Sequence, residues 1–231
     1  LLVITDGRTD CIPRTIDSAL ANLEGGDITE RWMYDDSGDL EHRVWLMHRF
    51  PQWQVFYHPD GRQGFGGAIR AAWERLREES TAEYIFHLED DFTFNRPVPL
   101  DDMMEILDEE LDIAQVALRR QAWNDTEKKA GGVIEVHPDA YIERHGHFTS
   151  YLEHNLFFTT NPSLYRRSLI DLGWPEGSAS EGRFSARLRD NGYRFAYLGE
   201  RSDPPWVGIS STSKRRMPWW AKIFSTVIHE K

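Results

Sequence analysis

Residues 84–94 read Y-I-F-H-L-E-D-D-F-T-F, an apolar run that ends in three consecutive carboxylates, Glu89, Asp90 and Asp91. A short apolar run bounded by charge predicts a buried strand, and a strand buried on both faces is typical of a parallel sheet. In open α/β sheets, ligands bind outside the carboxyl ends of the strands. The stretch therefore predicts a group of carboxylates at the ligand-binding edge of such a sheet.

Adjacent carboxylates repel one another unless a cation lies between them. Oxygen ligands suit Mg²⁺ or Mn²⁺, and these ions usually bridge one or two carboxylates to the phosphates of a substrate. The acidic triplet accordingly indicates a divalent-metal site. A solvated acidic turn at the end of a strand explains the same residues equally well, so both interpretations stay open at this point.

The chain before this stretch alternates strand and helix three times. Strands are expected at residues 1–5, 29–34 and 53–57, and each is followed by apolar residues at helical spacing. A loop at residues 58–67 contains four glycines and precedes the third helix. Alternating strands and helices predict a Rossmann-like, mainly parallel α/β sheet with right-handed crossovers.

After residue 95 the pattern is less regular. Helices are expected at residues 101–111, 162–172 and 181–191, and strands at residues 113–118, 133–137, 155–160, 194–198 and 206–209. Ser180 is the expected N-cap of the last helix, and residues 121–132 are polar and loop-like. We find no repeat, low-complexity segment or linker in the sequence. The chain is therefore expected to form one domain over residues 1–231.

Composition and charge narrow the classes of function. The net charge of −11 disfavours nonspecific nucleic-acid binding as the main activity, since such binding relies on a basic surface. The single cysteine, Cys11, rules out an internal disulfide and fits a reducing, cytoplasmic compartment. No apolar run reaches the ~18 residues of a membrane span. The basic and aromatic tail at residues 214–228 is a candidate contact for the acceptor, a partner or a membrane surface.

Four segments, in this order, resemble the GT-A-fold glycosyltransferases, particularly the family-2-like group and its phage and bacterial branch: V-I-T-D-G-R, Y-D-D-S-G-D, G-F-G-G-A-I-R and H-L-E-D-D-F. A later segment, S-E-G-R-F-S-A-R-L, looks like the one that carries the family's catalytic carboxylate. The resemblance covers roughly residues 1–200. It implies a GT-A sheet with a nucleotide-sugar-binding half at residues 1–95 and an acceptor-facing half at residues 96–231.

The resemblance implies a particular set of donor contacts. The expected nucleotide-sugar-binding residues are Thr5, Asp6, Arg8, Asp36, Arg70 and Asp90. Asp36 matches the position that accepts a hydrogen bond from the uracil N–H, which makes a UDP-sugar the expected donor; the alternative is a turn or helix-start aspartate. Arg70 is expected to face the diphosphate, and the alternative is a solvated helix arginine.

The same resemblance implies a Mn²⁺ or Mg²⁺ cofactor held at the D-x-D-type motif by Asp91 and Glu89. Such a cation stabilises the charge that develops on the leaving diphosphate. Many family members have a histidine near the last strand as an additional metal ligand. Here Ile209 stands at that place, so the cation would have fewer ligands from the protein.

Glu181 is the expected general base, which would deprotonate the acceptor hydroxyl in an inverting transfer. The alternative is a glutamate that only stabilises the start of a helix. Trp174 and His154 are the expected acceptor or sugar contacts, while a histidine such as His154 also fits a structural role. The acceptor is left open between a protein, a glycan, a lipid and a modified nucleobase.

Two other classes of function compete with a glycosyltransferase. A nucleotidyltransferase or metal-dependent phosphohydrolase would want a basic phosphate loop near the first strand, where only Arg8 and Arg14 are present. A non-catalytic sugar-binding protein on the same scaffold would not need its catalytic carboxylates. The joint presence of Asp36, Asp91 and Glu181 favours the transferase.

Overall fold

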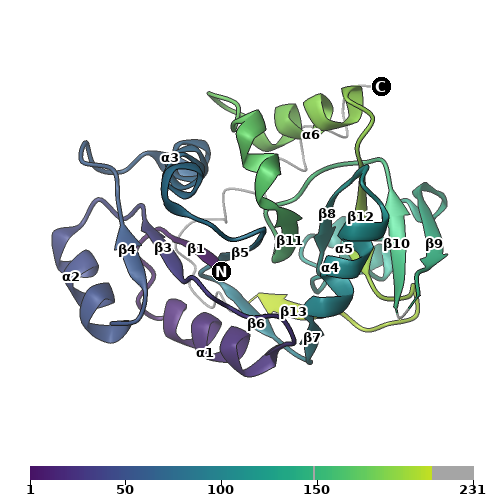
Figure 1. Cartoon of the computed structure of the whole chain (residues 1–231). Coiled ribbons are helices and arrows are strands. Elements are labelled where there is room, and N and C mark those ends of the chain that lie inside the picture. The colour runs from purple at the N-terminus through teal and green to yellow at the C-terminus, as the bar shows by residue number, and fades with distance from the viewer. Residues whose placement is uncertain (148, 210–231) are drawn as a thin grey trace.

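The computed structural model describes residues 1–147 and 149–209 (Figure 1). The strands are β1 (Leu2–Thr5), β2 (Leu23–Glu24), β3 (Trp32–Asp35), β4 (Gln54–Phe56), β5 (Tyr84–Glu89), β6 (Phe92–Phe94), β7 (Val98–Pro99), β8 (Ile113–Ala117), β9 (Tyr141–His145), β10 (Ser150–His154), β11 (Ser163–Arg166), β12 (Arg194–Leu198) and β13 (Val207–Ile209). The helices are α1 (Ile12–Asn22), α2 (Leu40–Arg49), α3 (Gly64–Glu79), α4 (Leu100–Glu109), α5 (Asp125–Ala130) and α6 (Ser180–Asp190), with short 3₁₀ helices η1 (Pro138–Ala140) and η2 (Arg167–Leu172). No helix within the described ranges is long and apolar enough to cross a membrane. The tail at residues 214–228 lies outside the described residues.

Within the described residues, nine strands form one mixed sheet in the order β4-β3-β1-β5-β11-β8-β12-β10-β9. Strands β4, β3, β1 and β5 are parallel to one another, and β12 is parallel to β8. Strand β11 is antiparallel to β5 and β8, and β10 is antiparallel to β12 and β9. The α/β fold with a mixed sheet is confirmed, and its first half has the parallel pairing that strand–helix alternation predicts.

The parallel register brings three polar strand ends to one edge of the sheet. Thr5, the last residue of β1, pairs with Asp35 of β3, and Ile4 pairs with Glu89 of β5. Parallel strands point their carboxyl ends in the same direction, so whatever follows each strand collects at this edge. The register thus places the residues after β1, β3 and β5 together.

Helices cover both faces of this sheet (Figure 1). Helices α1 and α4 contribute to one apolar cluster, and α3 and α6 to another. Successive strand side chains point to opposite faces, and Leu2 and Val3 accordingly belong to different clusters. In the second cluster, the Trp73 ring lies 5.2 Å from the rings of both Trp174 and Phe184. This aromatic packing joins α3 to α6 above the sheet.

The prediction of a helix at residues 162–172 is wrong over its first part. Ser163–Arg166 form β11, which lies between β5 and β8 in the middle of the sheet, and only Arg167–Leu172 are helical, as 3₁₀ turns. Apolar side chains at this spacing fit a short helix as well as a strand. The hydrogen bonds offered by two neighbouring strands, which the local sequence does not contain, decide the outcome.

Two predicted strands are absent. Residues 133–137 form turns, with Val133 and Ile134 packed into a small cluster against Tyr141 and Tyr197. Residues 155–160 have no ladder partner in the part of the chain that the structure describes, and side chains bond their backbone instead, as described below. Strands β9 and β10 were not predicted. Four of the five residues of β9 are exposed, so its sequence lacks the apolar alternation of a buried strand.

Helix α5 was also missed, inside a segment predicted to be a loop. Asn124 is its N-cap and accepts a hydrogen bond from the Glu127 backbone N–H at 2.8 Å. The buried Glu127 carboxylate in turn binds the Arg120 guanidinium through two bonds of 2.7 and 2.9 Å. An asparagine followed by a glutamate three residues later is a known helix-start pattern, and it was the available signal.

Glu127→Ala is expected to lower the free energy of unfolding by about 3–5 kcal/mol, because it leaves the buried charge of Arg120 without its carboxylate. Urea unfolding measures the loss. Glu79→Ala is the matched control, since Glu79 and Arg75 form an ion pair of 2.8 Å on the exposed side of α3. The control should cost less than about 1 kcal/mol. Equal losses in the two variants would contradict the expectation.

Candidate functional site

A cavity lies at the carboxyl ends of β1, β3 and β5. It is lined by Ile4, Thr5, Asp6, Arg8, Asp36, Arg62, Phe65, Ala68, Ile69, Glu89 and Asp90. Six of these residues, Thr5, Asp6, Arg8, Asp36, Glu89 and Asp90, are predicted from the sequence to bind the nucleotide sugar or the metal. The structure thus brings most of the predicted donor site to one place. Arg62 and Phe65 were not predicted from the sequence, although the glycine-containing loop that precedes α3 indicated this segment.

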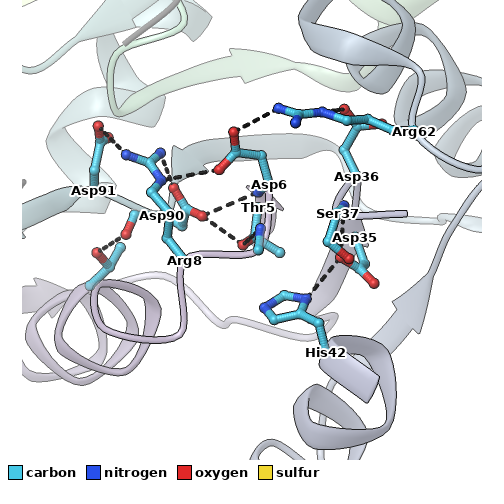
Figure 2. A network of polar contacts seen from close by, with 12 residues as sticks. Thr5, Asp6, Arg8, Asp35, Asp36, Ser37, His42, Arg62, Asp90 and Asp91 are labelled. Carbon is cyan, nitrogen blue, oxygen red and sulfur yellow. Dashed lines mark hydrogen bonds and ion pairs between the residues drawn. The ribbon is translucent and has the colours of Figure 1, made fainter. Parts of the chain in front are cut away.

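Arg8 lies among three carboxylates, as Figure 2 shows. Its Nη1 is 2.9 Å from Asp91 Oδ2, its Nη2 contacts Asp90 Oδ1, and its Nε is 3.2 Å from Asp6 Oδ1. The Asp90 and Asp91 carboxylates are fully buried, with exposed fractions of 1% and 0%, whereas the Arg8 side chain is 25% exposed. The guanidinium therefore supplies the positive charge next to two buried carboxylates.

Asp90 is also bound to the turn after β1. Its Oδ2 accepts hydrogen bonds from Thr5 Oγ1 at 2.6 Å and from the Asp6 backbone N–H at 3.3 Å. Its backbone carbonyl accepts a bond from Thr15 of α1 at 2.8 Å. Burial raises the pKa of Asp90 to about 7, although Arg8 acts in the opposite direction. These contacts fix Asp90 to β1 and α1 and leave its Oδ1 facing Arg8.

Glu89 lines the same cavity and also lies near Thr160 and Glu181. Burial, followed by the charge of Asp91, raises the pKa of Glu89 well above the ordinary value, and the neighbouring Thr160 acts in the opposite direction. Thr160 also bonds Glu181, whose Oε1 accepts from the Thr160 backbone N–H at 2.9 Å and from its Oγ1 at 3.2 Å. Thr160 thereby links the predicted catalytic carboxylate to the acidic triplet.

Glu181 lies in the first turn of α6 and is buried, with 5% of the residue exposed. Burial raises the pKa of Glu181 to about 7, and its hydrogen bonds from Thr160 and the charge of Arg120 only partly oppose this. A carboxylate with a pKa near neutrality can both accept and release a proton at physiological pH. Glu181 thus has the acid–base properties that a general base requires.

The irregular segment at residues 155–160 is what places Thr160. Ser185 Oγ accepts from the Phe158 backbone N–H at 2.8 Å. The Gln115 side chain accepts from the Thr159 N–H at 3.0 Å and donates to its carbonyl at 2.6 Å. Side chains from α6 and β8 thus replace the strand partner that the sequence led us to expect.

The start of α6 differs from the prediction. Ser180 is the first helical residue and not the N-cap, a position taken by Ala179 in the left-handed region at φ 54°. A left-handed non-glycine residue costs of order 1–3 kcal/mol and persists where surrounding contacts enforce it. Ser180 Oγ lies so close to α3 that a Cβ on Gly66 would be 2.8 Å from it. Close contact between α3 and α6 therefore constrains the turn that carries Glu181.

Asp36 is buried and bonded to the start of α3. Its Oδ1 accepts from the Gln63 backbone N–H at 2.7 Å, and its Oδ2 is 3.8 Å from Arg62 Nε. Arg62 also reaches Asp6, with Nη2 2.9 Å from Oδ2 (Figure 2). Asp36 thus has a structural bond through one oxygen, while it lines the cavity beside Arg62.

Five predicted residues do not line the cavity: Asp91 and Glu181, described above, and Trp174, Arg70 and His154. Trp174 contacts Phe65, which lines the cavity, and the centres of the two rings are 6.1 Å apart. Trp174 itself belongs to the aromatic cluster of α3 and α6. Arg70 is half-buried on α3. His154 of β10 stacks on Tyr197 at 5.3 Å, and burial lowers the pKa of His154 to about 3, so it is neutral at physiological pH.

Asp90 and Asp91 fit a hard divalent cation in their chemistry. Within residues 1–147 and 149–209, no group of three or more histidine, cysteine, aspartate or glutamate side chains is arranged to hold a metal ion. The two aspartates nevertheless converge on one positive group, the guanidinium of Arg8. Two carboxylates suffice for Mg²⁺ when substrate phosphates supply further oxygens. Ile209 pairs with Phe92, next to Asp91, and offers no ligand there.

The chain has the fold of GT-A glycosyltransferases. Solved structures similar to it include Staphylococcus aureus TarS 1–349 in complex with UDP-GlcNAc, with a TM-score of 0.60 and 16% identity over 95% of this chain and 59% of that one. The mannosyltransferase PcManGT from Pyrobaculum calidifontis, in complex with GDP-Man and Mn²⁺, has a TM-score of 0.62 and 12% identity over 100% and 64% of the two chains. GalNAc-T7 with UDP, GalNAc and Mn²⁺ has a TM-score of 0.61 and 13% identity over 90% and 43%.

These likenesses establish the fold and not the reaction, because the identities are low. The chain spans less than two thirds of the length of each of these three proteins. No protein-family model matches the chain, and no curated protein matches it in sequence.

Glu181→Gln is expected to remove part of the pH dependence of stability. A carboxyl with a higher pKa in the folded state stabilises the fold below its unfolded pKa of 4.5, and that contribution is lost as the pH rises through about 7. Glutamine keeps an oxygen for the Thr160 donors and does not titrate. Between pH 4.5 and 7, wild type should lose roughly 3 kcal/mol relative to the variant. Urea unfolding at several pH values measures this, and a difference that is constant with pH would contradict it.

Proposed function

We propose that the protein transfers a sugar from a nucleotide-diphosphate donor, with a UDP-sugar as the expected donor, to an acceptor hydroxyl with inversion. The observation that carries this proposal is the link from Glu89 through Thr160 to Glu181. It joins a buried carboxylate with a pKa of about 7 to the polar strand ends of a GT-A sheet. Donor and acceptor chemistry would then meet at one edge of the sheet.

The donor half of the proposal rests on the cavity residues and on the relatives. Thr5, Arg8, Asp36 and Asp90 line the cavity, and Arg62 adds a positive charge there. TarS and GalNAc-T7 are solved with uridine nucleotides, and PcManGT with GDP-Man. For this chain we assign uracil recognition to Asp36.

A divalent cation, Mn²⁺ or Mg²⁺, would be held by Asp91 together with Asp90. GalNAc-T7 and PcManGT are solved with Mn²⁺. When bound, such a cation neutralises negative charge on the departing diphosphate. Glu89, which the sequence also suggested as a ligand, lies next to Thr160 and serves the Glu181 side of the site in this proposal.

Glu181 is the proposed general base. Thr160 holds one of its oxygens with two donors, which leaves the other oxygen for the acceptor hydroxyl. The acceptor oxygen would form the new bond to the anomeric carbon while its proton passes to Glu181 and the bond to the diphosphate breaks. Attack from the face opposite the leaving diphosphate inverts the anomeric centre.

Asp36→Asn tests the donor base. The asparagine carbonyl can still accept the Gln63 N–H bond, but its amide NH₂ would face the uracil N3–H, donor against donor. UDP affinity should fall by about 1–3 kcal/mol. CDP affinity should rise, because cytosine N3 is an acceptor.

Calorimetry with UDP, CDP and GDP measures these affinities, and unfolding curves check that α3 is intact. The assignment of Asp36 is wrong if wild type binds UDP and GDP equally well, or if the variant loses both pyrimidine nucleotides alike.

Glu181→Gln tests the reaction itself. The variant should bind donor with near-normal affinity and transfer or hydrolyse sugar roughly 10²–10⁴-fold more slowly, since glutamine cannot take the proton. A panel of nucleotide sugars with Mn²⁺ identifies the donor, with released diphosphate as the readout. Glu176→Gln, a change of an exposed glutamate ahead of α6, is the control and should keep wild-type turnover.

Full activity in Glu181→Gln would remove it as the base. Release of pyrophosphate, or cleavage of diphosphates that carry no sugar, would instead indicate a nucleotidyltransferase or phosphohydrolase. Donor binding without turnover for any sugar would indicate a non-catalytic protein.

A further inference from the structure

The position of Arg8 raises a question about the metal site. Arg8 follows β1 in a turn where Gly7 has φ 100°. The backbone carbonyl of Arg8 accepts hydrogen bonds of 3.1 Å from the N–H groups of Cys11 and Ile12 at the start of α1. The backbone of Arg8 is therefore fixed between β1 and α1. Its long side chain, in contrast, is partly exposed and has only carboxylates as bonding partners among the contacts described above.

The guanidinium and a divalent cation would need the same oxygen atoms. Asp90 Oδ2 is taken by Thr5 and Asp6, so Oδ1 is the oxygen that Asp90 presents to a cation, and Arg8 Nη2 contacts it. Arg8 Nη1 lies 2.9 Å from Asp91 Oδ2. A cation that binds these carboxylate oxygens at ~2.0–2.2 Å would place its positive charge beside the guanidinium, so the two positive groups would repel each other. Arg8 and a metal would therefore compete for this pair of carboxylates.

Electrostatics favours the exchange of one positive group for another at Asp90 and Asp91 over a state in which neither carboxylate has a positive partner. Two buried carboxylates without a cation are strongly destabilising, so one of the two positive groups must be present whenever both are ionised. Asp6, whose side chain is 32% exposed, holds the Arg8 Nε at 3.2 Å. It gives the guanidinium a second, more exposed partner outside the pair.

The small size of the cavity also indicates that the arginine side chains move when a ligand binds. Its volume is about 30 Å³, against about 300–1,000 Å³ for typical small-molecule sites. Arg8 and Arg62 both line it, and both are long, flexible side chains that can move without a change in the backbone. Entry of a diphosphate therefore requires these side chains to rearrange.

We propose that Arg8 is a displaceable counter-ion of the metal site, which neutralises Asp90 and Asp91 until a divalent cation takes its place. The proposal explains how the protein folds with this acidic pair buried before any cofactor binds. It rests on the metal site of the proposed function, but its test uses neither donor nor acceptor. Failure of the transferase assignment would therefore leave its outcome unaffected.

The test titrates Mn²⁺ alone into nucleotide-free protein and follows bound Mn²⁺ by electron paramagnetic resonance. Arg8→Ala should bind Mn²⁺ at least about tenfold more tightly than wild type, because the cation no longer competes with a buried ion pair. Arg8→Lys should lie between the two, since an ammonium lacks the fork that reaches both carboxylates. Arg62→Ala is the matched control: it removes an arginine from the same cavity that contacts Asp6 and Asp36, and should bind Mn²⁺ as wild type does.

Thermal unfolding provides the second readout and shows whether each variant is folded. Mn²⁺ should raise the unfolding temperature of Arg8→Ala more than that of wild type, and chelator should reverse the gain. The proposal is overturned if folded Arg8→Ala binds Mn²⁺ no more tightly than wild type, or if Arg62→Ala shows the same gain. If Arg8→Ala does not fold, Arg8→Lys decides, and wild-type Mn²⁺ affinity in that variant overturns the proposal.

Discussion

The burial of three consecutive carboxylates at the end of β5 is the constraint on which the site depends. An ionised carboxylate in a protein interior costs several kcal/mol unless partners surround it. In this protein the three carboxylates have different partners. Asp90 and Asp91 contact Arg8, whereas Glu89 lies next to Thr160 near α6. One acidic run thus supplies both a cation-binding side and an acid–base side.

The acid–base side of the site consists of Thr160 and Glu181. It exists because residues 158–160 do not form a strand. A ladder would have used the Thr160 N–H within the sheet, and Glu181 would have lacked its donor. Instead Gln115 and Ser185 bond the backbone of Thr159 and Phe158, and Thr160 is left to hold Glu181. Contact between α3 and α6 holds the strained turn at Ala179 that precedes the carboxylate. The position of one proposed catalytic group therefore depends on three separate parts of the chain.

Prediction from sequence succeeded where local pattern and final environment agree. Strands β1, β3 and β5 are short apolar runs that end in polar residues, and each overlaps the segment predicted for it, although β3 begins at Trp32 and not at residue 29. The pattern failed where distant partners decide. Ser163–Arg166 became a central strand because β5 and β8 offered hydrogen bonds on both sides. Tyr141–His145 pairs as an exposed edge strand without apolar alternation. Arg62 enters the cavity through contacts with Asp6 and Asp36 that no local signal in its loop reveals.

The sequence by itself determined the α/β class, the polar edge at the ends of β1, β3 and β5, and the acidic triplet at that edge, because hydrophobic periodicity and strand ends are local properties. Only the tertiary structure decided which carboxylate faces which partner. It inserted Arg8 between Asp90 and Asp91, assigned Glu89 to Thr160, and buried His154 in an aromatic stack away from the cavity lining. The physical reason is that a side chain's charge state and partners are set by burial and by groups from distant elements, which meet only when the sheet and its two helical layers have assembled.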